Sequence, residues 1–208
     1  MRGLPAKTTI TTGDHGPPGG KGIIGRVKIH RRSPPGFEVD LGLVRIRSWR
    51  AGDAEALARH ASNRKVWVNM RDRFPHPYSR ADAEAYLETV IGANPETHFA
   101  IEHAGEAVGG VGYVLGTDVH RRSAELGFWL GESLWGRGIM TAVVKAMVPR
   151  AFALHDLVRI HAYVFEWNPA SMRVLEKCGF TSEGRLRFSV TKDGRTIDQV
   201  LYAIFRDA

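Results

Sequence analysis

The chain has 208 residues, a formal net charge of +7 and a single cysteine, Cys178. One cysteine cannot form an internal disulfide, and there is neither an apolar run of about 18 residues nor an apolar segment near the start, so we expect neither a membrane span nor a secretory signal. We therefore expect a cytoplasmic protein with one domain of ordinary size and an extension.

Residues 1–40 differ in composition from the rest of the chain. They hold eight of the 23 glycines, five of the ten prolines and more than half of the excess positive charge. Such composition is typical of chain without regular structure. We interpret 1–40 as a disordered basic extension and 41–208 as the domain. A solvated tail is favoured over a specific nucleic-acid contact, because basic and aromatic residues do not interleave there.

The first predicted elements of the domain are a strand and a helix. Residues 43–47 alternate apolar and basic side chains, as a strand with one buried face does. Residues 53–62 carry apolar side chains at helical spacing, whereas 65–73 are ambiguous. The following F-P-H-P-Y-S is expected to be irregular, since each proline restricts the residue before it.

A second helix and a hairpin are predicted next. The helix begins at Ser79, which forms with Asp82 a capping box in which Asp replaces the usual Glu. Residues 98–103 and 107–115 alternate as the strands of a hairpin. Three glycines in its second strand indicate a bulge or the close approach of another backbone: Gly109, Gly110 and Gly112.

Residues 124–154 organise the rest of the domain. Residues 125–130 are short, apolar and aromatic, which favours a strand. The loop 131–138 contains W-G-R-G, and the helix predicted over 139–154 has an apolar stripe. The stripe consists of Ile139, Val143, Val144, Met147, Val148 and Phe152.

This strand, loop and helix start predict an anion site. The first N–H groups of a helix have no partner within it, and the helix dipole adds partial positive charge there. Gly136 and Gly138 would let the backbone approach a phosphate or pyrophosphate, and Arg137 adds a full charge. A surface loop with turn glycines and a solvated arginine remains the alternative, because the spacing fits neither common phosphate-binding motif.

The last part of the domain predicts a strand, a helix and a hairpin. Residues 158–165 form the strand, and the helix runs from the cap Asn168 to about Cys178, where Gly179 ends it. Two strands, 185–191 and 196–205, are joined by a turn with Asp-Gly. The resulting order, β-α-α-β-β-β-α-β-α-β-β, indicates an α/β (α+β) fold with a mixed, mostly antiparallel central sheet and helices on both faces.

Over about 43–208 the chain resembles the GNAT acetyltransferase superfamily, and within it the ribosomal-protein N-terminal acetyltransferases of the RimJ/RimL type. The resemblance is carried by the order and spacing of A-E-L-G-F-W-L, W-G-R-G-I-M-T, N-P-A-S-M-R-V-L-E-K-C-G-F and S-E-G-R-L-R. It implies the acyl-CoA N-acyltransferase fold and acetyl-CoA as co-substrate.

The resemblance also implies where acetyl-CoA binds. Two parallel strands, here 125–130 and 158–165, would splay apart around the pantetheine arm. The implied contacts are main-chain groups of Phe128, Trp129 and Leu130, the pyrophosphate loop Gly136, Arg137, Gly138, Ile139, Met140 and Thr141, and the side chain of Asn168.

The pyrophosphate loop departs from the superfamily pattern, Gln/Arg-x-x-Gly-x-Gly/Ala. Trp135 stands in its first position and Met140 in its last, while Gly138 fits. Ala142 stands where many relatives have Glu. We do not interpret these departures as loss of binding.

Acetyl transfer requires a neutral amine and a route by which the leaving thiolate regains a proton. An α-amine has a reference pKa of ~7.7–8.0 and therefore needs less help from a base than a lysine amine at ~10.4. Glu125 is the first candidate for this base, directly or through water. Its alternative role is an ion pair with Arg121 or Arg122, and Glu183 is a second candidate or a surface charge.

Ser171 matches the position that, by resemblance, protonates the leaving thiolate; alternatively it bonds backbone in the first helical turn. Tyr163 and Tyr202 are further candidate acids or core residues. Cys178 is interpreted as a small buried residue rather than a nucleophile. The nine histidines show no metal-ligand spacing, so we predict no metal.

The leading hypothesis is an N-acetyltransferase that moves the acetyl group of acetyl-CoA directly to a primary amine. The acceptor would be a protein N-terminus, for instance of a ribosomal protein, or a small-molecule amine, and the enzyme a monomer or homodimer. The alternatives are a non-catalytic acyl-CoA-binding or regulatory module with the same fold, and a basic-tailed interaction protein.

Overall fold

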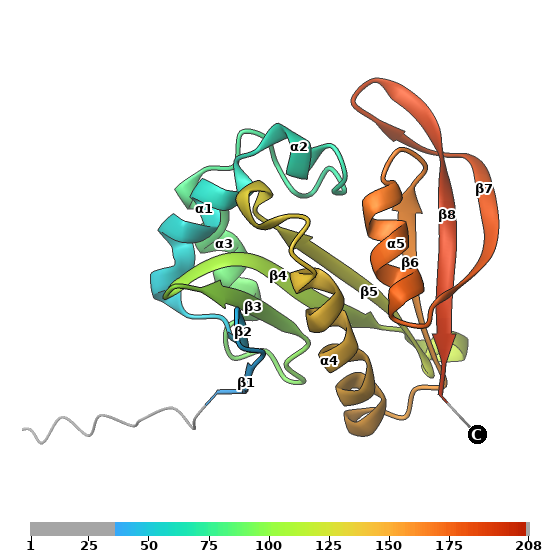
Figure 1. Ribbon diagram of the computed structural model, residues 1–208, viewed down its shortest axis with the longest axis horizontal. Helices are drawn as coiled ribbons and strands as arrows, with labels where there is room; N and C mark the ends of the chain where they lie inside the picture. The colour runs from blue at the N-terminus through green and yellow to red at the C-terminus, as the bar shows by residue number, and fades with distance from the viewer. Residues whose placement is uncertain (1–35, 207–208) are drawn as a thin grey trace, which may run out of the picture. The chain divides into compact units, whose positions relative to one another are not determined.

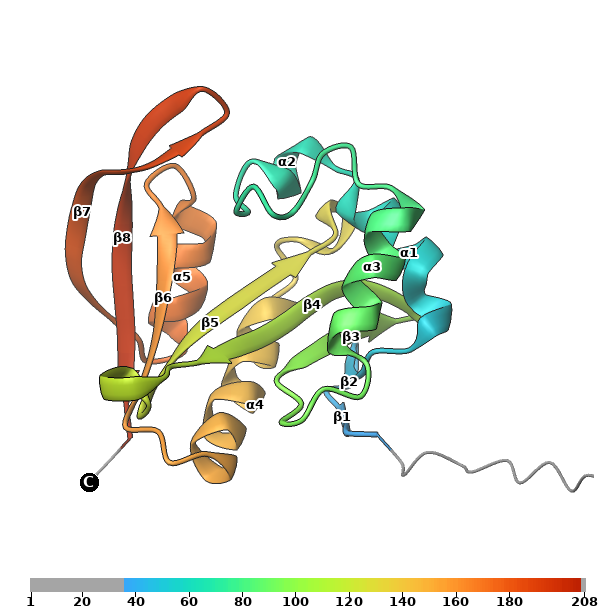
Figure 2. The same ribbon diagram turned by 180° about the vertical axis from the view of Figure 1, so that it is seen from behind.

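The computed structural model describes residues 36–206 (Figures 1 and 2). In that range one sheet has the strand order β1-β2-β3-β4-β5-β6-β8-β7. The strands are β1 (Glu38–Asp40), β2 (Arg45–Ser48), β3 (His98–His103), β4 (Glu106–Leu115), β5 (Ser123–Leu130), β6 (Arg159–Phe165), β7 (Thr181–Lys192) and β8 (Arg195–Phe205).

Helices separate these strands. They are α1 (Ala54–Ala61), α2 (Arg64–Trp67), α3 (Arg80–Val90), α4 (Ile139–Leu154) and α5 (Pro169–Lys177), with short 3-10 turns η1 (Ala51–Asp53), η2 (Asp118–His120) and η3 (Glu132–Leu134). No helix within residues 36–206 is both long enough and apolar enough to cross a membrane.

Every neighbouring pair of strands is antiparallel except β5 and β6. This pair is parallel and is registered only from Ser123 opposite Arg159 to Glu125 opposite His161. The predicted fold class, a mixed and mostly antiparallel sheet with helices, is therefore confirmed. The single parallel pair divides the sheet into β1–β5 and β6–β8.

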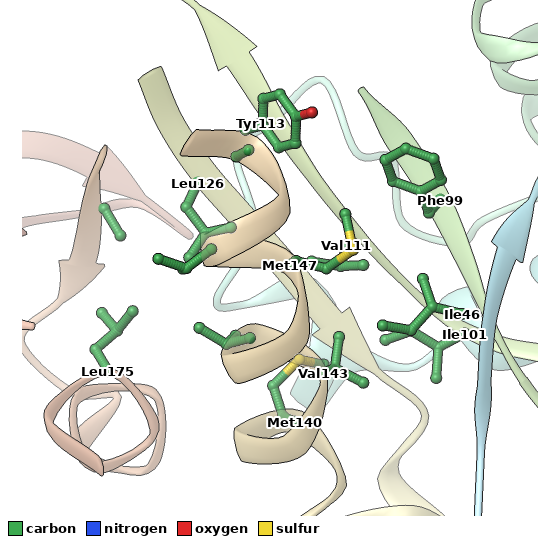
Figure 3. Packing of buried hydrophobic residues seen from close by; sticks show 14 of the residues in the cluster. Ile46, Phe99, Ile101, Val111, Tyr113, Leu126, Met140, Val143, Met147 and Leu175 are labelled. Carbon is green, nitrogen blue, oxygen red and sulfur yellow. The ribbon is translucent and has the colours of Figure 1, made fainter. Parts of the chain in front are cut away.

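The helices cover both faces of the sheet, as expected: α4 and α5 lie on the face toward the viewer in Figure 1, and α1 and α3 on the opposite face, seen in Figure 2. Under α4, Met140, Val143 and Met147 pack against strand residues such as Val111 and Leu126 (Figure 3). Each large apolar side chain buried in this way stabilises the fold by roughly 1.5–3 kcal/mol.

Two local predictions from the sequence are confirmed. Ser79 accepts a hydrogen bond from the Asp82 amide and donates its own amide to the Asp82 carboxylate, so the capping box is formed. Gly109 lies where a Cβ atom would stand 2.5 Å from the Trp129 carbonyl oxygen, which is the predicted close approach of another backbone. The register irregularity in this hairpin falls between Ile101 and Glu102 of β3.

Several element boundaries differ from the prediction, and three of these differences are larger or fall on an ambiguous stretch. The range 1–40 given to the extension includes β1, which pairs with β2, while residues 1–35 lie outside the described residues. The ambiguous stretch 65–73 overlaps α2, whose side-chain cap is Asn63. β7 begins at Thr181, not at 185, because it stays paired with β8 across two register irregularities.

The short β1 is held by aromatic packing that its three residues do not reveal. Phe37, next to it, packs edge-on against Phe99 of β3 with ring centroids 4.8 Å apart. The guanidinium of Arg150 lies 3.6 Å from the centroid of the Phe37 ring. Phe37 therefore packs against the core although it follows a proline- and glycine-rich stretch. This explains why composition placed the start of the domain at 41, a few residues too late.

Candidate active site

The site is built where β5 and β6 separate. Their register ends at Glu125 and His161, yet β5 stays paired with β4 as far as Leu130 and β6 with β8 as far as Phe165. The two strands diverge beyond that point, as Figure 2 shows. This is the splay that the family resemblance implied between 125–130 and 158–165.

The main-chain direction along β5 follows from two hydrogen bonds to β4. The amide of Gly131 donates to the Val108 carbonyl and the Ser123 carbonyl accepts from Gly116, each at 2.8 Å. The N–H and C=O groups of successive residues in a strand point to alternate neighbouring strands. The main-chain groups of Phe128 and Leu130 therefore point toward β6, on the diverging side, and those of Trp129 point toward β4. The expected main-chain contacts of Phe128 and Leu130 are thus correctly directed, whereas that of Trp129 is wrong.

Trp135 closes the end of this strand edge. Its indole N–H donates to the Leu130 carbonyl oxygen at 2.7 Å, so a residue that departs from the superfamily pattern has a defined structural contact. The Leu130 carbonyl is therefore occupied, and the Phe128 main-chain groups and the Leu130 amide remain as the polar groups aimed into the splay.

The loop before α4 has the backbone that an anion site requires. Gly136 and Gly138 have φ angles of 76° and 75°, a left-handed conformation that favours glycine. Gly138 precedes the helix without a side-chain cap, and the first turn of α4 contains no acidic residue. Its first amide groups and the exposed Arg137 therefore offer positive charge without a competing carboxylate.

The remaining predicted loop residues divide between core and surface. The side chains of Ile139 and Met140 are buried in the core under α4, so only their main-chain amides could contact a ligand. Thr141 is half-buried, and its carbonyl accepts from the Cys178 thiol at 3.5 Å. Burial raises the pKa of Cys178, which agrees with its interpretation as a structural residue.

Asn168 and Ser171 begin α5 on the far side of the splay. The Asn168 carboxamide oxygen accepts from the Ser171 amide at 3.2 Å, which confirms Asn168 as the helix cap. The Ser171 hydroxyl is half-buried and has no hydrogen-bond partner within residues 36–206, so the alternative in which it bonds backbone is not seen. It is free to donate to a bound group.

Glu125 forms an ion pair with a partner that the sequence did not indicate. It is bound by Arg71, 54 residues earlier in the chain, in the loop after α2. Arg122 pairs with Asp156 at 3.0 Å, and Arg121 donates to the Asp118 carbonyl. The expectation of an ion pair at Glu125 is confirmed, but the expected partners Arg121 and Arg122 are wrong.

Sequence reasoning missed His161. Its β6 neighbours Ile160 and Ala162 are buried under α4, so His161 points to the opposite face, as Glu125 does between Ala124 and Leu126. A search for metal-ligand spacing could not find it, because the signal is its register position opposite Glu125.

Charged groups around His161 are paired with one another. Glu183 binds Arg159, and this hydrogen bond lowers the pKa of Glu183, which therefore stays charged as a surface ion pair.

The two candidate tyrosine acids differ in exposure. The ring of Tyr163 packs edge-on against His161 and this residue is 38% exposed, whereas Tyr202 is buried. Burial and a 2.8 Å hydrogen bond to Glu176 raise the pKa of Tyr202 to about 12, which disfavours it as an acid.

The tip of the β7–β8 hairpin contacts α2 and the loop after it. Lys192 is 1% exposed, with its ammonium 2.7 Å from the Asp72 carboxylate and 3.6 Å from the centroid of the Trp67 ring. Asp193 pairs with Arg64 at 2.5 Å. These contacts join the β7–β8 hairpin to α2 and to the loop that contains Arg71. Within residues 36–206 no cluster of His, Cys, Asp and Glu has the arrangement of a metal site.

The model of the acetyltransferase (GNAT) domain family matches residues 43–181, about two thirds of the chain. The chain belongs to the GNAT acetyltransferase family. The splayed strands, the loop 135–138 and Ser171 all lie within the matched part of this GNAT domain.

Curated relatives of this GNAT domain are N-acetyltransferases by name. It is 36% identical over 101 residues to the uncharacterized N-acetyltransferase YoaA of Bacillus subtilis, a match that spans 49% of this chain and 56% of YoaA. It is 26% identical over 154 residues, 74% of this chain, to the spermidine N(1)-acetyltransferase of Vibrio cholerae, of which it covers 87%. The chain spans about half the length of several of the curated relatives it matches.

Solved structures agree on the fold. RimL, an α-N-acetyltransferase of ribosomal protein L7/L12 solved with coenzyme A, has a TM-score of 0.72 at 20% identity, over 81% of this chain and 98% of RimL. The ribosomal-protein-S5-alanine acetyltransferase of Vibrio fischeri has a TM-score of 0.72 at 19% identity, over 82% of this chain and 97% of that one. At this level of identity, these two neighbours show that the chain shares their fold.

Proposed function

We propose that the chain is an N-acetyltransferase that transfers the acetyl group of acetyl-CoA directly to a primary amine. The observation that carries the proposal is the combination of two main-chain features at one place. A strand edge is unpaired beyond Glu125, and the uncapped start of α4 follows a loop with two left-handed glycines. An elongated ligand with amide groups along one part and a diphosphate at its end fits both features.

The residues present fit acetyl-CoA. Phe128 and Leu130 would bond the amide groups of its pantetheine arm as a neighbouring strand does, and the amides of residues 138–141 with Arg137 would bind the diphosphate. Bound in this way, the co-substrate supplies a thioester that an amine can attack. Asn168 would hold the start of α5 in place, and the free hydroxyl of Ser171 would donate a proton to the leaving sulfur.

Glu125 and His161 both lie at the point where the strands separate and face the same side of the sheet. Either group could receive the amine proton, and Glu125 in addition could bind the ammonium form of the acceptor in place of Arg71. Relatives named for ribosomal proteins and for spermidine support an acceptor with a free primary amine.

Two measurements test the function. Acetyl-CoA should raise the melting temperature of the purified chain, whereas AMP, which lacks the pantetheine arm, should not raise it to the same extent. Free thiol should then appear when acetyl-CoA is mixed with a peptide that has a free α-amine or with spermidine, but not with the N-acetylated peptide.

The outcomes separate the proposal from its alternatives. Stabilisation without thiol release, across peptides and polyamines, would leave a non-catalytic acyl-CoA-binding module. The absence of stabilisation by any CoA species at millimolar concentration would exclude both, and the interaction protein would remain.

A further inference from the structure

His161 is the β6 residue in register with Glu125 where the strands separate. It is half-buried on the face opposite α4. Its Nδ1 atom lies 3.3 Å from the Ser123 hydroxyl, and its ring stands edge-on to Tyr163 with centroids 5.5 Å apart. These contacts fix the plane of the ring and leave Nε2 as the nitrogen not engaged with Ser123.

The charges that act on the imidazole come from β5, β6, β7 and the loop after α2, and they compensate one another. Glu125 of β5 is paired with Arg71 of the loop after α2, and Glu183 of β7 is paired with Arg159 of β6. Burial is the largest influence on the ring and lowers the pKa of His161, with Arg159 and Arg71 acting in the same direction and the two carboxylates opposing it. The imidazole is therefore neutral at neutral pH.

A neutral imidazole is better suited than a paired carboxylate to receive a proton from an amine. The Nε2 lone pair of the neutral ring is available to accept a proton, whereas the Glu125 carboxylate is already engaged by Arg71. Protonation of Glu125 would also leave Arg71 without its ion-pair partner. The role that remains for Glu125 is to attract the acceptor.

We propose that His161 is the general base of the reaction and that Glu125 positions the acceptor amine. The inference rests on the proposed function.

In this mechanism, the Nδ1–H group donates to the Ser123 hydroxyl, and the lone pair of Nε2 faces the acceptor. As the amine nitrogen forms its bond to the acetyl carbon, its proton passes to Nε2, directly or through one water. The carbon–sulfur bond breaks, sulfur leaves with the electron pair, and the Ser171 hydroxyl protonates it. Water restores the Ser171 proton and takes up the proton from His161.

The test compares three variants of the full chain. His161→Gln keeps a polar side chain of similar reach but cannot accept the proton. His120→Gln, at an exposed histidine of η2, is the matched control. Glu125→Gln removes the carboxylate. Each variant is first checked for stabilisation by acetyl-CoA, and kcat and KM are then measured for a peptide with a free α-amine across the pH range.

We expect His161→Gln to bind acetyl-CoA as the unsubstituted chain does and to lower kcat/KM about 100-fold at neutral pH, within the usual contribution of a general base. The acidic limb of its kcat profile at saturating peptide, which reports imidazole protonation in the complex, should disappear, and added imidazole should restore part of the rate. Titration of the free α-amine shapes kcat/KM equally in all variants. Glu125→Gln should mainly raise KM and keep the acidic limb.

An unchanged rate and pH profile in His161→Gln would overturn the proposal, and so would loss of the acidic limb in Glu125→Gln alone. Failure of imidazole to restore any activity would reduce His161 to a structural role. If the unsubstituted chain binds acetyl-CoA but acetylates no amine, the proposed function fails first and the assignment of His161 fails with it.

Discussion

Gly138 shows how one backbone angle supports the proposed diphosphate site. Its φ of 75° is unfavourable for any residue with a Cβ atom, although a Cβ would meet no atom within 4 Å. We predict that Gly138→Val turns the amides at the start of α4 away from their present direction and abolishes the rise in melting temperature with acetyl-CoA. Differential scanning fluorimetry with and without the ligand measures this.

Gly92→Val is the control for Gly138→Val. Gly92 has nearly the same φ, 76°, and equally open surroundings, but it lies after α3, outside the proposed site. Each substitution should cost about 1–2 kcal/mol or more of stability, since a left-handed conformation disfavours a branched residue. Only Gly138→Val should lose the ligand response, and a full response in that variant would remove the loop from the site.

Arg47 is a buried charge with two carboxylate partners. It is 2% exposed, and its guanidinium binds both oxygens of Asp53 at 2.7 and 2.8 Å and also contacts Glu102. Burial alone would lower the pKa of Arg47, but hydrogen bonds to Asp53 and Glu102 raise it overall, so the group stays charged. Asp53→Ala should therefore leave a buried cation only partly compensated.

We expect Asp53→Ala to lower the free energy of unfolding by about 3 kcal/mol, toward the lower end for a broken buried pair because Glu102 remains. Urea denaturation measures the change. Asp156→Ala, which breaks the exposed pair with Arg122, should cost under about 1 kcal/mol. Equal losses in the two variants would contradict a special role for the buried pair.

At the scale of elements, the β7–β8 hairpin tip and α2 should behave as one unit. Lys192→Met keeps the apolar stem but removes the ion pair with Asp72 and the contact with the Trp67 ring. A cation over an aromatic ring contributes about 0.5–2 kcal/mol. We predict faster amide hydrogen exchange both around 190–196 and around 64–72 in this variant.

Arg195→Met removes a charge from the same hairpin and serves as the control, since Arg195 stands farther from its ring, 5.4 Å from the Trp167 centroid. It should leave exchange around 64–72 unchanged. Faster exchange in Lys192→Met confined to the hairpin would show that Lys192 does not link the two elements.

The position of β1 and the packing of Phe37 beside it indicate where the folded domain begins. Because Phe37 packs on Phe99 and under Arg150, we propose that the domain starts near residue 36, and not at 41 as composition suggested. A chain that starts at 36 should melt at about the temperature of the full chain. A chain that starts at 42 should lose about 2 kcal/mol, or several degrees.

Phe37→Ala in the full chain tests the same contact without a truncation and should reproduce most of the loss. Equal melting temperatures for the chains that start at 36 and at 42 would contradict this boundary.

For the molecule as a whole, local sequence patterns predicted the helices and strands, but they did not predict side-chain ion pairs between residues far apart in the chain. The Ser79 cap, the strand alternation and the left-handed glycines of the loop depend on neighbours a few residues away, which the sequence displays. The contact of Arg71 with Glu125 joins residues 54 apart, and that of Lys192 with Asp72 joins residues 120 apart. Nothing in the identity of an arginine or a lysine specifies which of several carboxylates it will meet.

The last prediction concerns the stability of the whole domain in mild acid. Burial is the main cause that lowers the pKa of three histidines, His98, His155 and His161. In the unfolded chain these groups titrate near ~6.5, so between that value and their native pKa the unfolded state binds more protons. Stability must therefore fall as pH decreases below about 6.5, until the native groups are protonated as well. Protonation of carboxylates with a lowered pKa, such as Asp82 and Asp198, reduces stability only at lower pH. We therefore attribute the loss of stability between pH about 5 and 6.5 to the histidines.

The melting temperature should be nearly constant from pH about 7 to 8 and should fall between pH about 6.5 and 5. His98→Gln should make the fall shallower and the exposed His120→Gln should not, and a fall of unchanged steepness in both would show that buried imidazoles are not its cause.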